Sequence, residues 1–461
     1  MIACFVPSAN SETRSNLLNE PLVKSVCPID GPMTATSTLK GMESFANCPY
    51  TLLYIKDTTL SLVHFALERM VQIAEDTGAA MVYADHFNDR GPAPVIDYQE
   101  GSLRDDFDFG GLLLYRTDVF LKALASMDKD YAYAGLYDLR LKASRLGKIE
   151  HIGEYLYYEI ETDTRKSGEK LFDYVDPKNR AVQIEMEQAV TDHLKAVGGY
   201  LEPVFKDVSL EGGDFEYEAS VIIPCRNRVR TIGDALRSAL SQKTSFKYNV
   251  IVVDDNSTDG TVDVIKGFLS DPKLVYIAQD KTYHAIGGNW NAALHHPQCG
   301  RFAIQLDSDD MYYDENTVQK FVDAFREQNC AMVVGTYQMT DFNLNPLPPG
   351  VIDHREWTPE NGRNNALRVN GFGAPRGFYV PLLRELNFPT TKYGEDYAVA
   401  LRVSREYQIG RIYDVVYNCR RWDDNSDAAL DVFATNANNY YKDRIRTWEL
   451  SARIAKNSSK A

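Results

Sequence analysis

Carboxylates cluster at one point of the chain, directly after a short apolar run. Residues 301–310 read Arg-Phe-Ala-Ile-Gln-Leu-Asp-Ser-Asp-Asp, and a helical pattern follows over Glu315–Phe325. The apolar run predicts a buried strand that places Asp307, Asp309 and Asp310 at its carboxyl end. Carboxylates packed this closely repel one another unless a cation or a ligand compensates their charge. The segment therefore predicts a cation or ligand site, and a polar turn that caps the next helix is the structural alternative.

Two earlier strands also end in polar residues. One apolar strand is expected at Val221–Ile223 and is halted by Pro224, and a second is expected at Tyr248–Val253. A helix pattern follows each of them. Consecutive strand–loop–helix units form parallel sheets, and ligands bind where the carboxyl ends of the strands meet. The sequence thus predicts an α/β fold with one ligand-binding rim.

Four motifs in this order resemble the inverting family 2 glycosyltransferases of GT-A fold. They are Val221-Ile222-Ile223-Pro224, Val252-Val253-Asp254-Asp255-Asn256-Ser257-Thr258-Asp259-Gly260-Thr261, Asp307-Ser308-Asp309 and Gly394-Glu395-Asp396-Tyr397. The resemblance covers roughly residues 218–426. It implies a catalytic GT-A domain with a central, mostly parallel sheet over residues 218–430. It also implies hexosyl transfer from a nucleoside-diphosphate sugar to a glycan, a lipid-linked molecule or a small hydroxyl acceptor, as in polysaccharide biosynthesis.

The same resemblance implies a metal and a nucleotide site. Sugar transfer leaves negative charge on the departing nucleoside diphosphate, so a divalent cation or fixed positive groups must stabilise it. Mn²⁺ or Mg²⁺ is expected on Asp309 and Asp307, with Asp307 also near the nucleotide. The other expected nucleotide contacts are Pro224, Arg226, Asp254, Asp255, Gly288 and Asn291. Helix capping by the residues after Asp254 and a plain loop around Gly288 are the structural alternatives.

The chain departs from the family pattern after its last expected strand. Many relatives carry a histidine there, whereas residues 413–426 contain none. Arg420, Arg421 and Asp423 are candidates to replace it. A guanidinium suits a diphosphate, and Arg421 is therefore the expected diphosphate contact.

An inverting transfer needs a general base on the side of the sugar opposite the leaving group. By resemblance, Asp396 has this role, because a helix is expected over Tyr397–Tyr407 and places the carboxylate in its first turn. The positive field there favours the ionised form. A simple helix cap is the alternative, with Glu395 as the neighbour that could be confused with the base. Trp357, Arg376 and Glu395 are expected around the acceptor and the sugar, although a long surface loop would show the same composition.

The first part of the chain resembles the second. Residues 133–145 match residues 393–405 in step, and Ile55–Tyr83 runs parallel to Leu306–Val334. This pattern predicts a degenerate, truncated GT-A-like domain over residues 1–165, with chance similarity as the alternative. Only about fifty residues precede Ile55, which we expect to be too few for two full strand–helix units.

The expected N-terminal copy has lost its acidic residues. Lys56 and Thr58 stand at the positions of Asp307 and Asp309, and Gly135 and Leu136 replace Glu395 and Asp396. This copy should not hold a divalent cation in the same way, so its role is expected to be structural or related to the acceptor.

The remaining segments are expected to be helical. Residues 166–217 form a helical linker, centred on residues 180–197, and residues 431–461 form a C-terminal helix. That helix carries arginines beside apolar residues. Packing on the domain is the preferred interpretation, and contact with a membrane that holds a lipid-linked acceptor is the other.

Composition limits the function classes. The chain has 461 residues with 44% apolar and 25% charged side chains, as in ordinary globular proteins. A net charge of −15 argues against nucleic-acid binding. No apolar stretch reaches the ~20 residues that span a bilayer. Seven cysteines without a Cys-x-x-Cys pair fit a reducing compartment, so a cytoplasmic protein is expected, with attachment to the inner membrane face and homo-oligomerisation left open.

Two other functions compete with glycosyl transfer. A sugar nucleotidyltransferase would carry a glycine-rich loop after its first strand, and Val221–Arg230 has no glycine. A non-catalytic scaffold that binds nucleotides or glycans would not need Asp307, Asp309 and Asp396. Glycosyl transfer is therefore the favoured interpretation.

Overall fold

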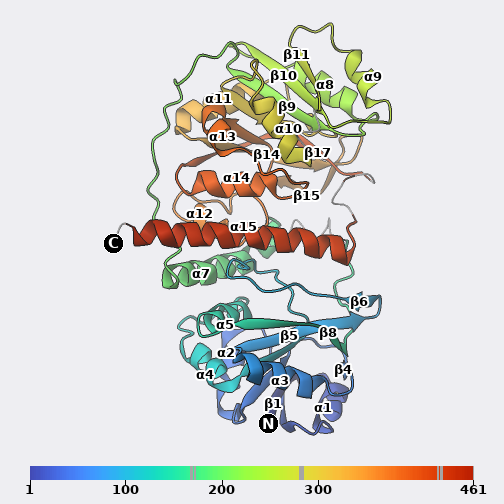
Figure 1. The fold of residues 1–461 in the computed structure, drawn as a ribbon, viewed down its shortest axis with the longest axis vertical. Helices are drawn as coiled ribbons and strands as arrows, with labels where there is room; N and C mark the ends of the chain where they lie inside the picture. Colours follow the sequence, from blue (N-terminus) through green and yellow to red (C-terminus); the bar gives the residue numbers. More distant parts are fainter. Residues whose placement is uncertain (167–169, 171–172, 280–284, 423–424, 426–428, 460–461) are drawn as a thin grey trace. The chain divides into compact units, whose positions relative to one another are not determined.

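The chain forms two compact units. The computed structural model describes residues 1–166, 170, 173–279, 285–422, 425 and 429–459 (Figure 1). Unit 1 comprises Met1–Tyr200, Leu367–Val369 and Ala429–Ala461, and unit 2 comprises Leu201–Ala366 and Asn370–Ala428. Among the described helices, none combines the length and the apolar character needed to cross a membrane.

Unit 2 is built on one sheet with the strand order β11-β10-β9-β12-β16-β14-β17-β13, and β15 pairs with β14. These strands are β9 (Ala219–Cys225), β10 (Tyr248–Asp254), β11 (Leu274–Ala278), β12 (Phe302–Gln305), β13 (Met311–Tyr312), β14 (Met332–Thr340), β15 (Pro346–Ile352), β16 (Arg376–Tyr379) and β17 (Ile409–Arg420). The first four strands in the order are parallel, and β16 is inserted antiparallel between β12 and β14. The expected α/β fold is confirmed, and its parallel pairs include β11–β10, β10–β9 and β9–β12, whereas β16 is antiparallel to both of its neighbours.

Pro224 does not halt its strand, contrary to the expectation from the sequence. It lies within β9 and pairs with Val253 of β10. On its other side, the pairing between β9 and β12 ends at Ile222, opposite Gln305. Because no strand continues there, the N–H group that proline lacks would have had no ladder partner. The strand end therefore tolerates Pro224.

Helices accompany the strands of unit 2 as expected. They are α8 (Ile232–Leu240), α9 (Thr261–Lys266), α10 (Ala285–Leu294), α11 (Thr317–Gln328), α12 (Gly362–Asn365), α13 (Val380–Leu386) and α14 (Glu395–Ser404). In α11 the buried residues Val318, Phe321, Val322 and Phe325 follow the spacing of one helix face. This face packs towards the sheet and positions the loop after β12.

Unit 1 repeats the sheet of unit 2 with one strand fewer. Its order is β2-β1-β3-β7-β5-β8-β4, with β6 paired to β5. The strands are β1 (Ile2–Pro7), β2 (Val23–Ile29), β3 (Tyr50–Tyr54), β4 (Ser61–Leu62), β5 (Met81–Asn88), β6 (Gly91–Ala93), β7 (Leu112–Arg116) and β8 (Ile149–Tyr158). Residue pairs also correspond, since Met81 pairs with Ile149 as Met332 pairs with Ile409. Within residues 1–166, no strand corresponds to β11.

One expectation about unit 1 is wrong. The residues before Ile55 do contain two strand–helix units, because short helices suffice. The helices of unit 1 are α1 (Ser11–Leu18), α2 (Thr36–Lys40), α3 (Ala66–Thr77), α4 (Thr117–Ala125), α5 (Gly135–Ser144), α7 (Arg180–Ala196) and α15 (Val432–Ser458), with 3₁₀ turns η1 (Glu43–Phe45) and η2 (Pro177–Asn179). The eight residues of α1 return the chain from β1 to β2.

The helix α15 packs into unit 1 through buried polar contacts. Asp443 pairs with Arg104 at 3.3 Å and with Arg446 at 2.8 Å, and all three side chains are buried. The backbone N–H of Gly101 donates to the hydroxyl of Thr447 at 3.1 Å. A side chain at Gly101 would collide with the backbone of Thr447, so the helix and this loop meet at close range.

Candidate active site

The acidic segment follows β12 as expected. Asp307 and Asp309 are partly buried, whereas Asp310 is buried. The backbone N–H of Asp307 donates to the hydroxyl of Tyr417 in β17 at 3.0 Å, and Asp310 Oδ1 accepts from the N–H of Arg420 at 2.7 Å. The carboxyl-terminal part of β17 thereby holds the segment in place.

The electrostatics of this segment favour a bound cation. Burial raises the pKa of Asp307, and the charge of Asp309 adds to the increase, while hydrogen bonds from Gln305 oppose it. Burial raises the pKa of Asp310 well above its usual value, and the charges of Asp309 and Asp307 raise it further. Burial and repulsion between carboxylates therefore disfavour the ionised forms of Asp307 and Asp310, and a positive group bound there would oppose both effects.

Two arginines lie beside Asp309. Arg228 Nε is 3.8 Å from Asp309 Oδ2, and Arg420 Nε donates to the Asp309 carbonyl at 2.5 Å. Arg420 is buried and also pairs with Asp234 at 2.9 Å. Trp422 Nε1 and Asn425 Nδ2 reach Asp309 Oδ2 at 3.3 and 3.4 Å. The rim thus combines carboxylates with guanidinium groups, a composition suited to a metal–diphosphate ligand.

Asp396 lies in the first turn of α14, as expected. The turn before it requires Gly394, whose φ is +80°. Asp396 Oδ1 accepts from the N–H of Tyr397 at 2.7 Å, and Oδ2 forms a salt bridge with Arg376 of β16. Glu395 is buried beside it. The structure therefore brings Arg376 and Asp396, predicted separately, into direct contact.

Gln305 connects this pair with Asp307, and sequence reasoning missed it. Its Oε1 accepts from Arg376 Nε at 3.0 Å and from the Arg376 backbone N–H at 3.2 Å. Its Nε2 lies 2.9 and 3.0 Å from the two carboxylate oxygens of Asp307. The sequence does contain an indication of a special role for Gln305, because it is the polar residue in an otherwise apolar buried strand.

The predicted base and ribose contacts meet at the ends of β9 and β10. The N–H of Asp255 donates to the carbonyl of Cys225 at 2.9 Å, and Asp254 Oδ2 accepts from the N–H of Ser257 at 3.2 Å. Arg226 is largely exposed and lies 3.7 Å from Asp255. Pro224 is paired with Val253 close to these residues, and their nucleotide role stays a prediction.

Gly288 and Asn291 lie inside α10 and not in a loop. Asn291 exchanges hydrogen bonds of 2.8 Å with the backbone N–H and carbonyl of Phe388. A Cβ on the neighbouring Gly287 would stand 1.9 Å from the carbonyl oxygen of Pro389. This part of α10 is therefore built for close packing against the loop at 388–389, and its nucleotide role stays a prediction.

The two remaining predicted residues lie in different surroundings. Trp357 packs its ring against Phe372, 5.3 Å away, and beneath the guanidinium of Arg411 at 4.7 Å. Arg421 donates its backbone N–H to the carbonyl of Thr340 at 2.8 Å. Asp423, the other candidate for the missing histidine, lies outside the described residues.

The residues present fit one kind of metal site. Among the described residues, no three His, Cys, Asp or Glu side chains are placed to hold an ion together. Mg²⁺ and Mn²⁺ are commonly bound by one or two carboxylates plus substrate phosphates and water. Asp309 and Asp307 match that pattern, in which the nucleotide completes the site.

The corresponding place in unit 1 carries different chemistry. Lys56 forms a salt bridge with the buried Glu159, whose Oε1 also lies 3.2 Å from His86 Nε2. A Cβ on Gly111 would come within 2.3 Å of Glu159 Oε2, so this glycine makes room for the carboxylate. The ammonium group of Lys56 therefore lies at the position that corresponds to Asp307 of unit 2.

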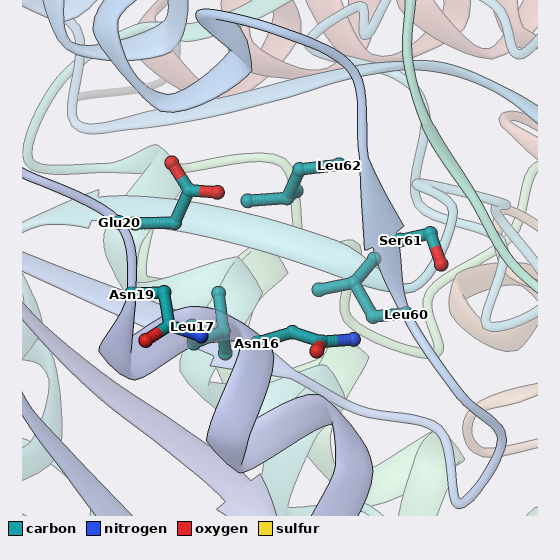
Figure 2. A pocket seen from close by; sticks show the side chains of 7 residues that line it. All are labelled: Asn16, Leu17, Asn19, Glu20, Leu60, Ser61 and Leu62. Carbon is teal, nitrogen blue, oxygen red and sulfur yellow. The ribbon is translucent and has the colours of Figure 1, made fainter.

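Unit 1 also contains a separate pocket of about 270 Å³ (Figure 2). It lies between the end of α1 and the segment around β4, with Glu20 and Asn19 on one side and Leu60 and Leu62 on the other. None of the predicted site residues lines it. We assign it no role in the chemistry of unit 2.

Comparison with known proteins matches part of the chain to a family and to several relatives. The family model described as Glycosyl transferase family 2 matches residues 220–380. The Escherichia coli UDP-Glc:alpha-D-GlcNAc-diphosphoundecaprenol beta-1,3-glucosyltransferase WfgD is 27% identical over 43% of this chain and 74% of its own length. The putative teichuronic acid biosynthesis glycosyltransferase TuaG of Bacillus subtilis is 30% identical over 32% of this chain, and the match spans 58% of TuaG.

A solved structure overlaps partially. S. aureus TarS 1-349 in complex with UDP-GlcNAc is 22% identical, with a TM-score of 0.39 over 51% of this chain and 72% of TarS 1-349. The family match confirms the expected resemblance over the first three motifs, whereas the fourth, residues 394–397, lies beyond the matched residues. Residues 220–380 belong to glycosyl transferase family 2, and the domain around them is a glycosyltransferase domain.

Proposed function

We propose that unit 2 transfers a sugar, with inversion, from a nucleoside-diphosphate sugar to a hydroxyl group of a glycan or lipid-linked acceptor. The observation that carries this proposal is the set of contacts between the predicted cation site after β12 and the predicted general base at the start of α14. Asp307 at the end of β12 and Asp396 at the start of α14 are joined through Gln305 and Arg376. The connection between the proposed donor-binding carboxylate and the proposed base supports this function.

A divalent cation, Mn²⁺ or Mg²⁺, would be held by Asp309 and Asp307. When bound, it would neutralise the negative charge that develops on the nucleoside diphosphate. Burial is the main cause of the raised pKa values of Asp307 and Asp310, and repulsion between neighbouring carboxylates adds to it, so a bound cation would favour the ionised forms. Arg228 and Arg420 lie on the same side and would add fixed positive charge near the phosphates.

Asp396 would accept the proton of the attacking hydroxyl. Its Oδ1 accepts from the N–H of Tyr397, and its Oδ2 pairs with Arg376. These contacts orient the carboxylate, and a positioned carboxylate within hydrogen-bond reach of the acceptor hydroxyl can take its proton.

A uridine diphosphate sugar is the first donor to test. The relative WfgD is named for UDP-Glc and a diphosphoundecaprenol acceptor. The proposed nucleotide edge is formed by Pro224, Arg226, Asp254 and Asp255, with Gly288 and Asn291 on α10 and Arg421 after β17. Trp357 and Glu395 are proposed on the acceptor side.

The test uses the full chain. Thermal unfolding is followed with UDP and with GDP, each with and without Mn²⁺, since a ligand that binds only the folded state raises the melting temperature. Release of nucleoside diphosphate is then measured from UDP-glucose, UDP-N-acetylglucosamine and GDP-mannose. We expect a Mn²⁺-dependent shift with one nucleotide and release from a sugar of that nucleotide. Binding without release would favour the non-catalytic scaffold, and the absence of both would refute the proposal.

A further inference from the structure

A continuous set of hydrogen bonds connects the two carboxylates of the site. Asp307 accepts from Gln305, Gln305 accepts from Arg376, and Arg376 pairs with Asp396. The side chains of Arg376 and Asp396 are 14% and 24% exposed, so water screens their interaction only partly. The four residues come from the end of β12, the start of β16 and the start of α14.

We propose that Arg376, held in place by Gln305, is a positioning residue that fixes the Asp396 carboxylate for proton transfer and couples its orientation to the cation-binding end of β12. This inference rests on the proposed function. It adds a role for Arg376 that differs from contact with the sugar or the acceptor, and it gives a role to Gln305.

The contacts of Arg376 with Asp396 and Gln305 require a planar guanidinium group, which only arginine has. Arg376 Nη1 reaches Asp396 while Nε and the backbone N–H both reach Gln305 Oε1. A planar guanidinium can point its donors in two fixed directions, whereas the ammonium group of lysine cannot. The amide of Gln305 is oriented by these two contacts, and its N–H groups therefore face Asp307.

The positive charge of Arg376 is a second reason to expect that this residue positions Asp396. Arg376 lies between two carboxylates, and both Asp396 and Asp307 raise the pKa of its guanidinium against the effect of burial. Without this positive charge, Asp307 and Asp396 would repel each other across a largely buried space. Asp396 would then lose its ion pair with Arg376 and sample other orientations. Misplacement of a catalytic group by about 1 Å can cost about 10²-fold in rate.

The N-terminal copy offers an internal comparison. Tyr54 stands at the position of Gln305, and β7, which pairs with β3 as β16 pairs with β12, begins with three leucines, whereas β16 begins with Arg376. Leu136 stands at the position of Asp396 in the aligned helices α5 and α14. The copy without the base thus also lacks the glutamine and the arginine. The network of Gln305, Arg376 and Asp396 therefore has no counterpart at the aligned positions of unit 1, where Lys56, Glu159 and His86 interact instead.

The experiment compares the variants Arg376→Met, Arg376→Lys and Gln305→Leu of the full chain. Arg326→Met is the control, because it removes an exposed arginine–carboxylate pair of the same unit. For the nucleotide sugar that releases its diphosphate in the wild-type assay, kcat and KM are measured with Mn²⁺. Melting temperature with and without UDP or GDP and Mn²⁺ reports folding and donor binding separately.

We expect Arg376→Met to lower kcat by about 10- to 100-fold with KM within about 3-fold. Arg376→Lys should restore part of the loss, Gln305→Leu should give an intermediate loss, and Arg326→Met should match the wild type. The decisive comparison is made in the Asp396→Asn background, where Arg376→Met should have almost no further effect, because the group it positions is already inactive.

Two outcomes would overturn the inference while leaving the proposed function intact. One is a wild-type kcat in Arg376→Met. The other is a loss that is just as large in the Asp396→Asn background, which would assign Arg376 a role independent of the base. If Arg376→Met does not fold, the Lys and Gln305→Leu variants decide by the same comparison. Absence of activity in the wild type would instead count against the proposed function itself.

Discussion

Lys56 forms a salt bridge with Glu159 in unit 1, at the strand ends that in unit 2 carry Asp307 and Cys419. Glu159 is fully buried, and Lys56 keeps 23% of its side chain exposed. Burial tends to raise the pKa of the Glu159 carboxyl, but His86 and Lys56 together hold it below its usual value. In unit 1 the ammonium group of Lys56 therefore provides a positive charge at the place where we propose a bound divalent cation in unit 2.

This pair leads to a prediction about unit 1. Lys56→Met should leave nucleotide-sugar turnover within a few-fold of the wild type, because no pair of carboxylates binds a cation there. It should lower stability by about 1–3 kcal/mol, less than for a fully buried pair, since Lys56 is partly exposed. The double variant Lys56→Met, Glu159→Gln should recover part of that stability. Lost turnover in a well-folded Lys56→Met protein would show that unit 1 has an active site of its own.

Asp309→Ala should abolish the Mn²⁺-dependent part of the nucleotide shift and leave the melting temperature of the free protein nearly unchanged or higher. The physical reason is that its carboxylate is proposed to bind the cation while it also repels Asp307 and Asp310. Removal of metal with a chelator should have the same effect on the wild type. Asp263→Ala, an exposed acid of α9, is the control. A wild-type shift in Asp309→Ala would reject the metal assignment.

Asp396→Asn should lower turnover by about 10²–10⁴, the range for loss of a general base. Asparagine keeps the shape and can still accept from Tyr397, but it cannot take the proton. Nucleotide affinity should change little, because the carboxylate is proposed to face the acceptor. Rate and affinity are measured on the same preparation. Near wild-type turnover would leave Asp396 as a helix cap, and Glu395→Gln would be the next variant to examine.

His193 in α7 predicts a pH dependence of unfolding. Burial, with the charges of Arg145 and Arg140, lowers its pKa to about 3. Because the folded state disfavours the proton and the unfolded state binds it near pH 6.5, the contribution to stability is complete above pH 6.5 and is lost as pH falls. The loss should approach about 1.4 kcal/mol per pH unit between pH 6 and 3.

The variant His193→Gln keeps an N–H donor and cannot be protonated in this range. Its unfolding free energy, measured by denaturant titration between pH 4 and 8, should therefore depend less on pH than that of the wild type. His64→Gln serves as the control, because His64 is exposed. Parallel pH profiles of His193→Gln and the wild type would show that other groups cause the acid sensitivity.

The sequence located the strand ends of the rim, because apolar runs and the polar residues after them are local signals. Asp254 and Asp307 are predicted in this way and Asp396 by the family resemblance, and the structure places each at a strand end or a helix start. The contact between Gln305 and Arg376 joins residues 71 positions apart. This contact depends on the antiparallel insertion of β16 between β12 and β14, which no local sequence pattern predicts. For the same reason, nothing near Asn291 indicated that its amide would hold Phe388.

The end of the chain completes the unit in which the chain begins. Arg104 and Gly101 belong to the first quarter of the sequence, and their partners Asp443 and Thr447 lie on α15. During synthesis, the N-terminal sheet leaves the ribosome long before α15 has been made. Until then, Arg104 lacks its buried partner, the carboxylate of Asp443. A ribosome that stalls in unit 2 would therefore release two incomplete domains and not one, and a fragment ending near residue 200 should be a poor substitute for unit 1.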